Sequence, residues 1–292
     1  MGSGAYSINN RMLRASSMCY DTAAMDDIFT QNREGKANIA MNPNGVTLRE
    51  SRDSKDHPNS VPIIVALDVT GSMGSIPLYL VREGLPNMMD KIIKGGVPDP
   101  QVLFIGIGDH ECDQAPLQIG QFESNDEMLD EWLTKLWIEG NGGGNNGESY
   151  HLAWFFAGRY TEHDMMDKRK KKGVLFTIGD EPVLSNLSIK AQKRIMGDGQ
   201  YSDMSSTELL DKAKEKYDCF HLHMLQGCNG RNENVQNGWK QIMGDNLLFI
   251  QAKEQVSQVI ADKVIHLFKT NSNTSSKTDD TITVNKEEEI IL

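Results

Sequence analysis

A buried strand that ends in an aspartate and two spaced hydroxyls is the part of this sequence most suited to chemistry. The stretch IIVALDVTGSMGSIP, residues 63–77, runs from apolar residues into Asp68, Thr70 and Ser72. Carboxylate and hydroxyl oxygens at this spacing could bind a cation at the end of the strand. They could also cap the start of a helix, because Ser and Thr hydroxyls accept hydrogen bonds from free backbone N–H groups.

Two later strands and a glycine-rich loop carry further oxygen-bearing side chains. The strand predicted at 101–109 runs into an acidic stretch, and the strand predicted at 173–180 ends in an Asp-Glu pair. The loop EGNGGGNNGESY, residues 139–150, precedes a predicted helix. Ligands bind beyond the carboxyl ends of the strands in an open parallel sheet, so these segments should converge. They contribute Asp109, His110, Glu111, Asp113, Asn145, Asn146, Glu148, Ser149, Asp180 and Glu181.

The chemistry of these donors favours a hard divalent cation. Carboxylate, hydroxyl and amide oxygens suit Mg²⁺, with Mn²⁺ or Ca²⁺ as alternatives, whereas zinc and copper sites use Cys or His. Crowded carboxylates would repel one another without such an ion. The loop glycines, among them Gly144, tolerate positive φ and would let the backbone pass close to the ion. The stretch GDHECDQAP, residues 108–116, is interpreted as a solvated acidic loop at the rim.

The elements that would position these residues form an α/β pattern. From residue 61 onward, apolar runs of strand length alternate with amphipathic segments of helix length, which predicts a Rossmann-like fold. We expect a central, mostly parallel six-stranded sheet with helices on both faces. The predicted strands are 62–68, 101–109, 117–122, 173–180, 219–225 and 246–251. The predicted helices are 76–94, 125–138, 148–162, 188–196, 205–216 and 254–269, and a surface loop is predicted at 227–239.

Changes in composition predict three regions. Residues 1–60 are polar and irregular, with one possible strand at GVTLRES, residues 45–51, and are interpreted as an amino-terminal extension that packs on the main domain. Residues 61–269 form the main α/β domain. Residues 270–292 are rich in Ser, Thr, Asn and Asp and cannot bury enough apolar area to offset the entropy of ordering, so a flexible tail is predicted.

The overall composition argues against several classes of protein. The chain has 292 residues, of which 38% are hydrophobic, and its formal net charge is −11. This charge disfavours binding to nucleic acid or to an anionic membrane surface. The 4 cysteines are scattered without CxxC spacing, which argues against a disulfide framework. We see no signal segment and no run of about 20 apolar residues, so we expect a cytoplasmic location.

The arrangement of these residues resembles the von Willebrand factor A (vWA) domain. Asp68-x-Thr70-x-Ser72 follows the first buried strand, as in the D-x-[ST]-x-S motif of that family's metal-ion-dependent adhesion site (MIDAS). The glycine-rich loop and Asp180 follow in the matching order, and the resemblance covers roughly residues 61–269. It implies that Thr70 and Ser72 bind the metal through their hydroxyls. It also implies that Asp68 acts largely by holding hydroxyls and water, and that Asp180 contacts the metal directly or through water.

The sequence departs from the family pattern in the glycine-rich loop, where a Thr usually binds the metal. Asn145 occupies the aligned place, with Asn146, Glu148 or Ser149 as rivals. The resemblance therefore implies a metal-binding set of Asp68, Thr70, Ser72, Asn145 and Asp180. The residues implied to support the site or to contact a partner are Asp109, His110, Gly144, Asn146, Glu148 and Glu181.

In the vWA family the metal keeps one coordination position for a carboxylate of another protein. The resemblance therefore implies a binding or scaffold protein that recognises an Asp or Glu side chain of a partner through the ion. A second interpretation is a metal-dependent phosphohydrolase of the haloacid-dehalogenase type, with Asp68 as nucleophile. That chemistry needs a carboxylic acid two residues later, where this sequence has Thr70. A third is an assembly component that binds through residues 1–60 and the tail.

Overall fold

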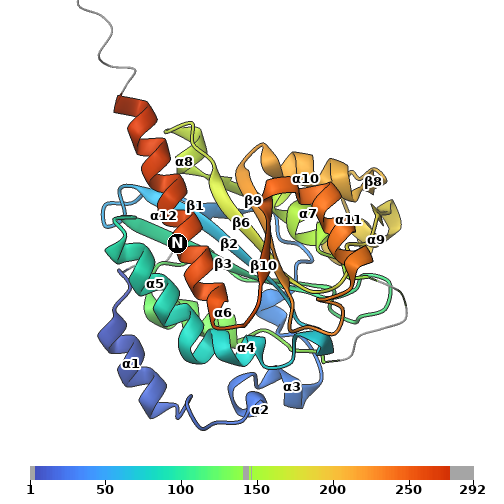
Figure 1. Ribbon diagram of the computed structural model, residues 1–292, viewed down its shortest axis with the longest axis horizontal. Helices are drawn as coiled ribbons and strands as arrows, with labels where there is room; N and C mark the ends of the chain where they lie inside the picture. Colours follow the sequence, from blue (N-terminus) through green and yellow to red (C-terminus); the bar gives the residue numbers. More distant parts are fainter. Residues whose placement is uncertain (1–3, 141–144, 146, 277–292) are drawn as a thin grey trace, which may run out of the picture.

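The centre of the molecule is a six-stranded sheet (Figure 1). The structure is a computed structural model that describes residues 4–140, 145 and 147–276, with side chains up to Thr270. The strand order is β10-β9-β6-β2-β3-β4, and every neighbouring pair is parallel except β3 and β4. The first strand of this sheet lies in its middle, and the order reverses there, as in doubly wound α/β proteins. The predicted fold class is therefore confirmed.

The central strands are buried on both faces. In β2, Ile63 and Val65 belong to one hydrophobic cluster, whereas Ile64 and Ala66 belong to the other. Uninterrupted apolar runs of this kind are typical of parallel sheets that helices cover on both sides. The strands are β2 (Ser60–Asp68), β3 (Asp99–Ile107), β4 (Leu117–Ile119), β6 (Gly173–Gly179), β9 (Tyr217–Met224) and β10 (Leu247–Ile250).

Helices cover the two faces of the sheet (Figure 1). One face packs against α4 (Ile76–Tyr79), η3 (Leu80–Gly84), α5 (Leu85–Lys94), α6 (Asp126–Thr134) and α12 (Gln255–Ser276). The other packs against α7 (His151–Tyr160), α9 (Ile189–Met196), α10 (Ser206–Lys214) and α11 (Glu233–Met243). Shorter elements are α2 (Met25–Ile28), α3 (Gln31–Glu34), η1 (Ile39–Met41), η2 (Gly71–Met73), α8 (Asp164–Asp167), η4 (Gly244–Asn246) and the strand pair β7 (Asn186–Leu187) and β8 (Met204–Ser205).

The amino-terminal segment contacts the main sheet and its helices through α1 (Ile8–Ser17) and β1 (Arg49–Ser51). Arg11 of α1 is 1% exposed, and its Nε lies 2.6 Å from Asp130 Oδ1 of α6. The same guanidinium donates to the backbone carbonyl of Val81 at 2.5 Å. β1 pairs in parallel with β5 (Thr161–His163). The possible strand at 45–51 is therefore present as β1, whereas the helix α1 was not predicted; both contact distant parts of the chain.

The surface loop predicted at 227–239 is wrong in its second half, because α11 begins at Glu233. Asn232 caps this helix, since its side chain accepts a hydrogen bond from the backbone N–H of Asn234 at 3.0 Å. Val235 and Trp239, one turn apart on α11, are both buried.

α12 is a helix of 22 residues that runs to Ser276, past the predicted end of the main domain at residue 269. The remainder of the predicted tail, 277–292, lies outside the described residues. Neither α12 nor any other helix in the described ranges is long and apolar enough to cross a membrane.

Candidate functional site

The carboxyl ends of β2 and β6 bring hydroxyl and carboxylate oxygens into one hydrogen-bonded row. Thr70 Oγ1 lies 3.2 Å from Ser72 Oγ, and Ser72 Oγ donates to Asp180 Oδ1 at 2.7 Å. We call Thr70, Ser72 and Asp180 the oxygen row. β2 and β6 are neighbours at the point where the strand order reverses, which is where open α/β sheets bind ligands.

Asp68 lies next to this row and is fully buried. Its Oδ1 accepts hydrogen bonds from the N–H and the hydroxyl of Thr70, at 2.9 and 2.6 Å. Its Oδ2 accepts a hydrogen bond from the Tyr150 hydroxyl at 2.7 Å. Burial raises the pKa of Asp68 to about 7, and the nearby charge of Asp180 adds to the rise. Both oxygens of Asp68 therefore hold the residues around the row.

Asp180 is fully buried, and both of its carboxylate oxygens have partners. Oδ1 accepts from Ser72, and Oδ2 accepts from the backbone N–H of Asn229 at 2.9 Å. The backbone at Gly227 passes so close that a Cβ there would lie 2.2 Å from Asp180 Cγ. Glycine is therefore required at this position. The Asn229 side chain also donates to Glu181 Oε1 at 2.7 Å, so one loop holds both carboxylates that follow β6.

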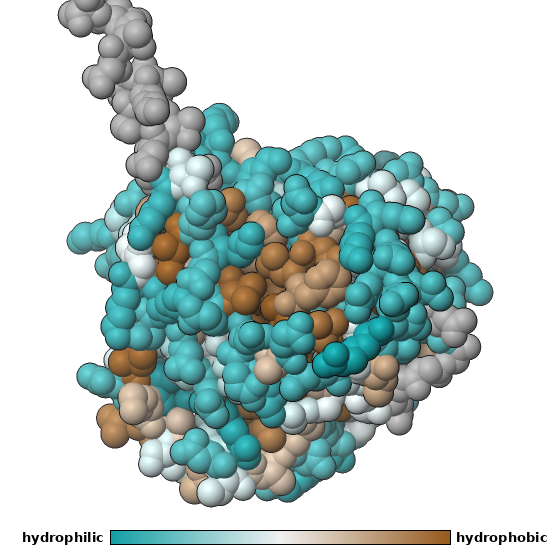
Figure 2. Space-filling model, in the orientation of Figure 1, coloured by the Kyte–Doolittle hydropathy of each residue, from teal (hydrophilic) through white to brown (hydrophobic). Residues whose placement is uncertain are grey.

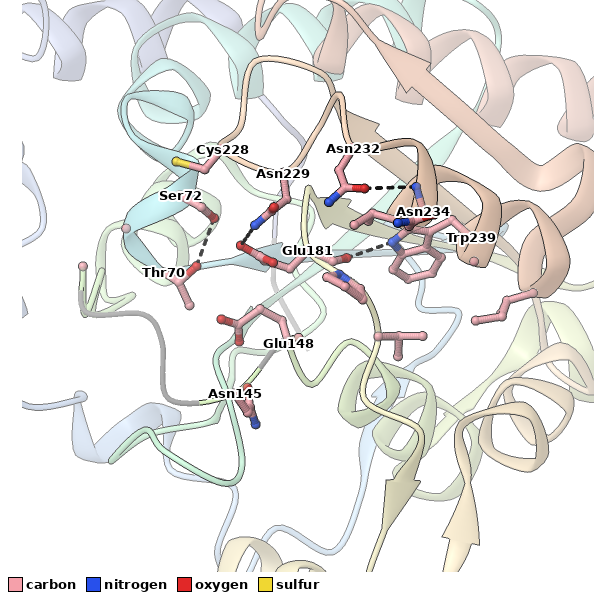
Figure 3. Close-up of a pocket in the computed structure, with 18 residues that line it drawn as sticks. Thr70, Ser72, Asn145, Glu148, Glu181, Cys228, Asn229, Asn232, Asn234 and Trp239 are labelled. Carbon is pink, nitrogen blue, oxygen red and sulfur yellow. Dashed lines mark hydrogen bonds between the residues drawn. The ribbon is translucent and has the colours of Figure 1, made fainter.

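Glu148 is the loop residue whose carboxylate has an oxygen without a hydrogen-bond partner. It is 4% exposed, and among the described residues its Oε2 has no partner. Figure 3 shows its carboxylate extending into the same cavity as Thr70 and Ser72. Burial raises the pKa of Glu148 to about 10, and the charge of Asp68 is the next largest cause. A buried carboxyl beside other carboxylates is costly unless a cation or a proton neutralises it.

Asn145, the predicted loop ligand, has a hydrogen bond made by its amide nitrogen and not by the oxygen that would bind a metal. It lies on the wall of the same cavity, but its Nδ2 donates to Glu111 Oε2 at 2.7 Å. Gly144 and Asn146, which were predicted to support the site, lie outside the described residues.

Asp109 and His110 lie away from the cavity. They are 2% and 7% exposed, so the solvated loop predicted at 108–116 is wrong for these two positions. Asp109 Oδ1 accepts from the backbone N–H of Glu111 at 2.8 Å, and His110 Nδ1 lies 2.7 Å from Ser149 Oγ. Neither side chain lines the cavity, and both are too buried to touch a partner directly.

The oxygen row opens into a cavity of about 780 Å³ (Figure 3). Thr70 and Ser72 lie at one end of it, and Trp239 of α11 lies at the other. The side chains with carboxyl groups on its described walls are Glu148 and Glu181. The cavity is therefore acidic where it meets the row.

No family model matches the chain, and no curated protein matches it. One similar solved structure is the pilus adhesin SpaC from Lactobacillus rhamnosus GG in its open conformation, with 12% identity and a TM-score of 0.49 over 75% of this chain and 31% of that chain. Another is a von Willebrand factor type A protein from Catenulispora acidiphila, with 11% identity and a TM-score of 0.37 over 72% and 43%. A third is proximal thread matrix protein 1 from the mussel byssus with a zinc-occupied MIDAS motif, with 15% identity and a TM-score of 0.42 over 72% and 48%. The chain spans less than half the length of each of these structures, so its function is inferred from its own site.

Three residues that support the site were not singled out from the sequence: Tyr150, Asn229 and Trp239. Trp239 Nε1 donates to the backbone carbonyl of Glu181 at 2.8 Å. Its ring stacks on His221, which is fully buried, with 3.4 Å between the ring centroids. The sequence signals for them are the position of Tyr150 at the end of the glycine-rich loop and the place of Trp239 four residues after Val235.

The side chains around the oxygen row could bind a hard cation only if hydroxyl oxygens serve as ligands together with carboxylates. Within the described ranges, no group of three or more His, Cys, Asp or Glu side chains is arranged to hold a metal ion. Thr70 and Ser72 would have to supply hydroxyl oxygens beside the carboxylates of Asp180 and Glu148. An oxygen-only set of this kind suits Mg²⁺, Mn²⁺ or Ca²⁺.

Proposed function

We propose that the chain is a vWA-type interaction domain that binds an Asp or Glu carboxylate of a partner protein through a divalent cation. The observation that carries this proposal is the 2.7 Å contact between Ser72 Oγ and Asp180 Oδ1. It joins residues 108 positions apart in the chain, at the strand ends where ligands of open α/β sheets bind. The cation is proposed to be Mg²⁺, with Mn²⁺ and Ca²⁺ as alternatives.

Each residue has a proposed role at this site. Thr70 and Ser72 would bind the cation through their hydroxyls, and Asp180 through its carboxylate. Asp68 would hold Thr70 in place, because its Oδ1 accepts hydrogen bonds from both the backbone N–H and the hydroxyl of Thr70. The free oxygen makes Glu148 a stronger candidate for the loop ligand than Asn145.

The electrostatics of the cavity support a cation-dependent partner. The described cavity walls carry no Lys or Arg, so without a cation they offer no positive charge to a carboxylate. A bound divalent ion supplies the positive charge that attracts the partner's carboxylate. Since the whole chain has a formal charge of −11, this ion would also determine where an acidic partner can approach.

The phosphohydrolase interpretation gains no support from the site. A nucleophilic carboxylate must reach the substrate, but Asp68 is fully buried and both of its oxygens accept hydrogen bonds. Thr70, at the position that would need a general acid, donates its hydroxyl to Asp68.

We also propose a cytoplasmic location. Cys19, Cys112, Cys219 and Cys228 are all free, and unpaired thiols are typical of a reducing compartment.

The cation and the open coordination position can be tested with Mn²⁺ as the metal and acetate as the carboxylate. Bound Mn²⁺ raises the relaxation rate of water protons, and acetate should lower that rate by displacing a coordinated water. Methylammonium, which cannot bind a cation, should have no effect. Asp180→Ala should weaken Mn²⁺ binding at least about tenfold, whereas Asp198→Ala, at an exposed position, should leave it unchanged.

The outcomes separate the two parts of the proposal. If the native chain binds no Mn²⁺, or if Asp180→Ala binds it equally well, the cation site is wrong. If Mn²⁺ binds but acetate leaves the relaxation rate unchanged, the carboxylate-bridging role is wrong.

A further inference from the structure

Strand β10 forms an open edge of the central sheet. It pairs with β9 on one side, and no other described strand pairs with its second side. Its four residues, Leu247–Ile250, are all apolar, and Phe249 is 38% exposed. Figure 2 shows apolar surface gathered over β10, between the hydrophilic surfaces of α12 and α11. An unprotected apolar edge of this kind is a template for pairing with another strand.

A lysine flanks this edge on each face of the sheet. On the α11 face, Lys240 Nζ lies 5.8 Å from the centre of the Phe249 ring. On the α12 face, Lys263 Nζ lies 5.3 Å from the centre of the Phe220 ring, and the partly buried Leu248 packs against the same hydrophobic cluster as Phe220. Neither lysine forms an ion pair with a described acidic residue. We call these five residues the edge patch.

The edge patch specifies the chemistry of its occupant. An added strand would place alternate side chains on the two faces, so it needs apolar residues at consecutive positions. Carboxylates next to those residues would pair with the two lysines. The occupant should therefore be an extended acidic and aliphatic segment.

We propose that residues 287–292 of this chain, Glu-Glu-Glu-Ile-Ile-Leu, bind to the edge patch and extend the sheet next to β10. Ile290 and Leu292 would lie on one face of the sheet and Ile291 on the other, beside Phe249 and Leu248. The three glutamates would face the lysines. The binding occurs within one molecule and is independent of the cation site.

The length of the connecting chain allows this binding. Lys263 and the end of α12 at Ser276 are 13 residues apart, about 20 Å along the helix axis at about 1.5 Å per residue. Residues 277–286 can span up to about 33 Å when extended. The segment can therefore turn back along α12 and reach the edge patch.

Amide hydrogen exchange on the full chain, resolved by residue, tests the proposal. Alternate amides in β10 point away from β9, and these are protected only if another strand pairs with them. In the native chain they should exchange slowly. Ile291→Asp should speed their exchange about tenfold or more, whereas the matched variant Ile282→Asp, in the same tail, should not. The β10 amides that donate hydrogen bonds to β9 should exchange at the same rate in the native chain and in both variants. This equality would show that the fold is intact.

A charge reversal tests the lysines. Lys240→Glu together with Lys263→Glu should speed exchange of the same amides, and changing Glu287, Glu288 and Glu289 to Lys in that background should restore protection. Fast exchange of the outward amides in the native chain would overturn the proposal, as would equal effects of Ile282→Asp and Ile291→Asp. A mass that doubles with concentration in light scattering, and returns to the monomer in Ile291→Asp, would overturn binding within one molecule.

Discussion

At the scale of single residues, Asp68 makes the site sensitive to pH. Burial raises its pKa to about 7 in the folded protein, whereas an unfolded chain releases this proton near pH 4. Between these values the folded state holds more protons than the unfolded state. The free energy of unfolding should therefore fall as pH rises from about 4 to about 7, by up to about 4 kcal/mol for this group.

The first prediction follows from this sign. Asp68→Asn cannot ionise, so without divalent cations it should need more urea to unfold than the native chain at pH 8. At pH 4, where Asp68 is protonated, the native chain and Asp68→Asn should unfold at the same urea concentration. Urea unfolding in EDTA at both pH values measures the difference, with exposed Asp198→Asn as the control. If Asp68→Asn were less stable than the native chain at pH 8, burial of the ionised Asp68 carboxylate would not destabilise the fold.

The second prediction distinguishes the two candidates for the loop ligand. Glu148→Gln keeps the size of the side chain and removes the carboxylate, so it should weaken Mn²⁺ binding about tenfold or more. Asn145→Ala should change it less than about twofold, because Glu148 and not this amide is the proposed loop ligand. Calorimetric titration of both variants measures the affinities. If Asn145→Ala lost more Mn²⁺ affinity than Glu148→Gln, Asn145 and not Glu148 would be the loop ligand.

The oxygen row could be predicted from sequence because its members follow parallel strands. The end of each strand fixes where the next residues lie, so the closeness of Thr70, Ser72 and Asp180 follows from the sheet alone. Glu148 could not be placed in this way. Its orientation depends on the path of a loop, which no repeating pattern encodes.

At the scale of elements, the fold shows the same contrast between regular strands, which the sequence predicts, and irregular segments, which it does not. The six strands are apolar runs with clear ends, and each was predicted close to its observed position. The helix α11 was missed because its first half is rich in Asn and Gly, which have low helix propensity. Its buried residues, Val235, Trp239 and Met243, do recur at four-residue spacing. Tertiary burial of that face overrides the local preference for a turn.

The third prediction concerns α1, which is held by buried charges. Arg11→Ala would leave Asp130 with Arg14 as its remaining ion-pair partner and the carbonyl of Val81 without its donor, so the free energy of unfolding should fall by about 2–3 kcal/mol. Arg33, whose side chain is 63% exposed, forms an ion pair with Asp27 and provides the control. Arg33→Ala should cost about 1 kcal/mol or less. Urea unfolding of both variants compares them.

Equal, small losses in the two variants would show that α1 is not part of the cooperative fold. A large loss for Arg11→Ala alone would show that the first 60 residues unfold together with the sheet.

At the scale of the whole molecule, two different charge effects should act on stability. The formal charge of −11 produces a diffuse repulsion that any salt weakens, with a screening length of about 8 Å at about 0.15 M. The oxygen row instead places the Asp180 carboxylate beside two hydroxyls at one point. A divalent ion bound there stabilises only the folded state, by an amount set by its affinity.

The last prediction separates these effects. NaCl should raise the melting temperature of the native chain and of Asp180→Ala equally, because screening does not depend on the site. MgCl2 at a concentration about 100 times its dissociation constant should add about 3 kcal/mol to the native chain alone, a shift of roughly 5 °C. Melting curves in NaCl and MgCl2 at matched ionic strength measure the two contributions. If the native chain and Asp180→Ala respond alike to both salts, the stabilisation is screening alone and the cation site does not exist.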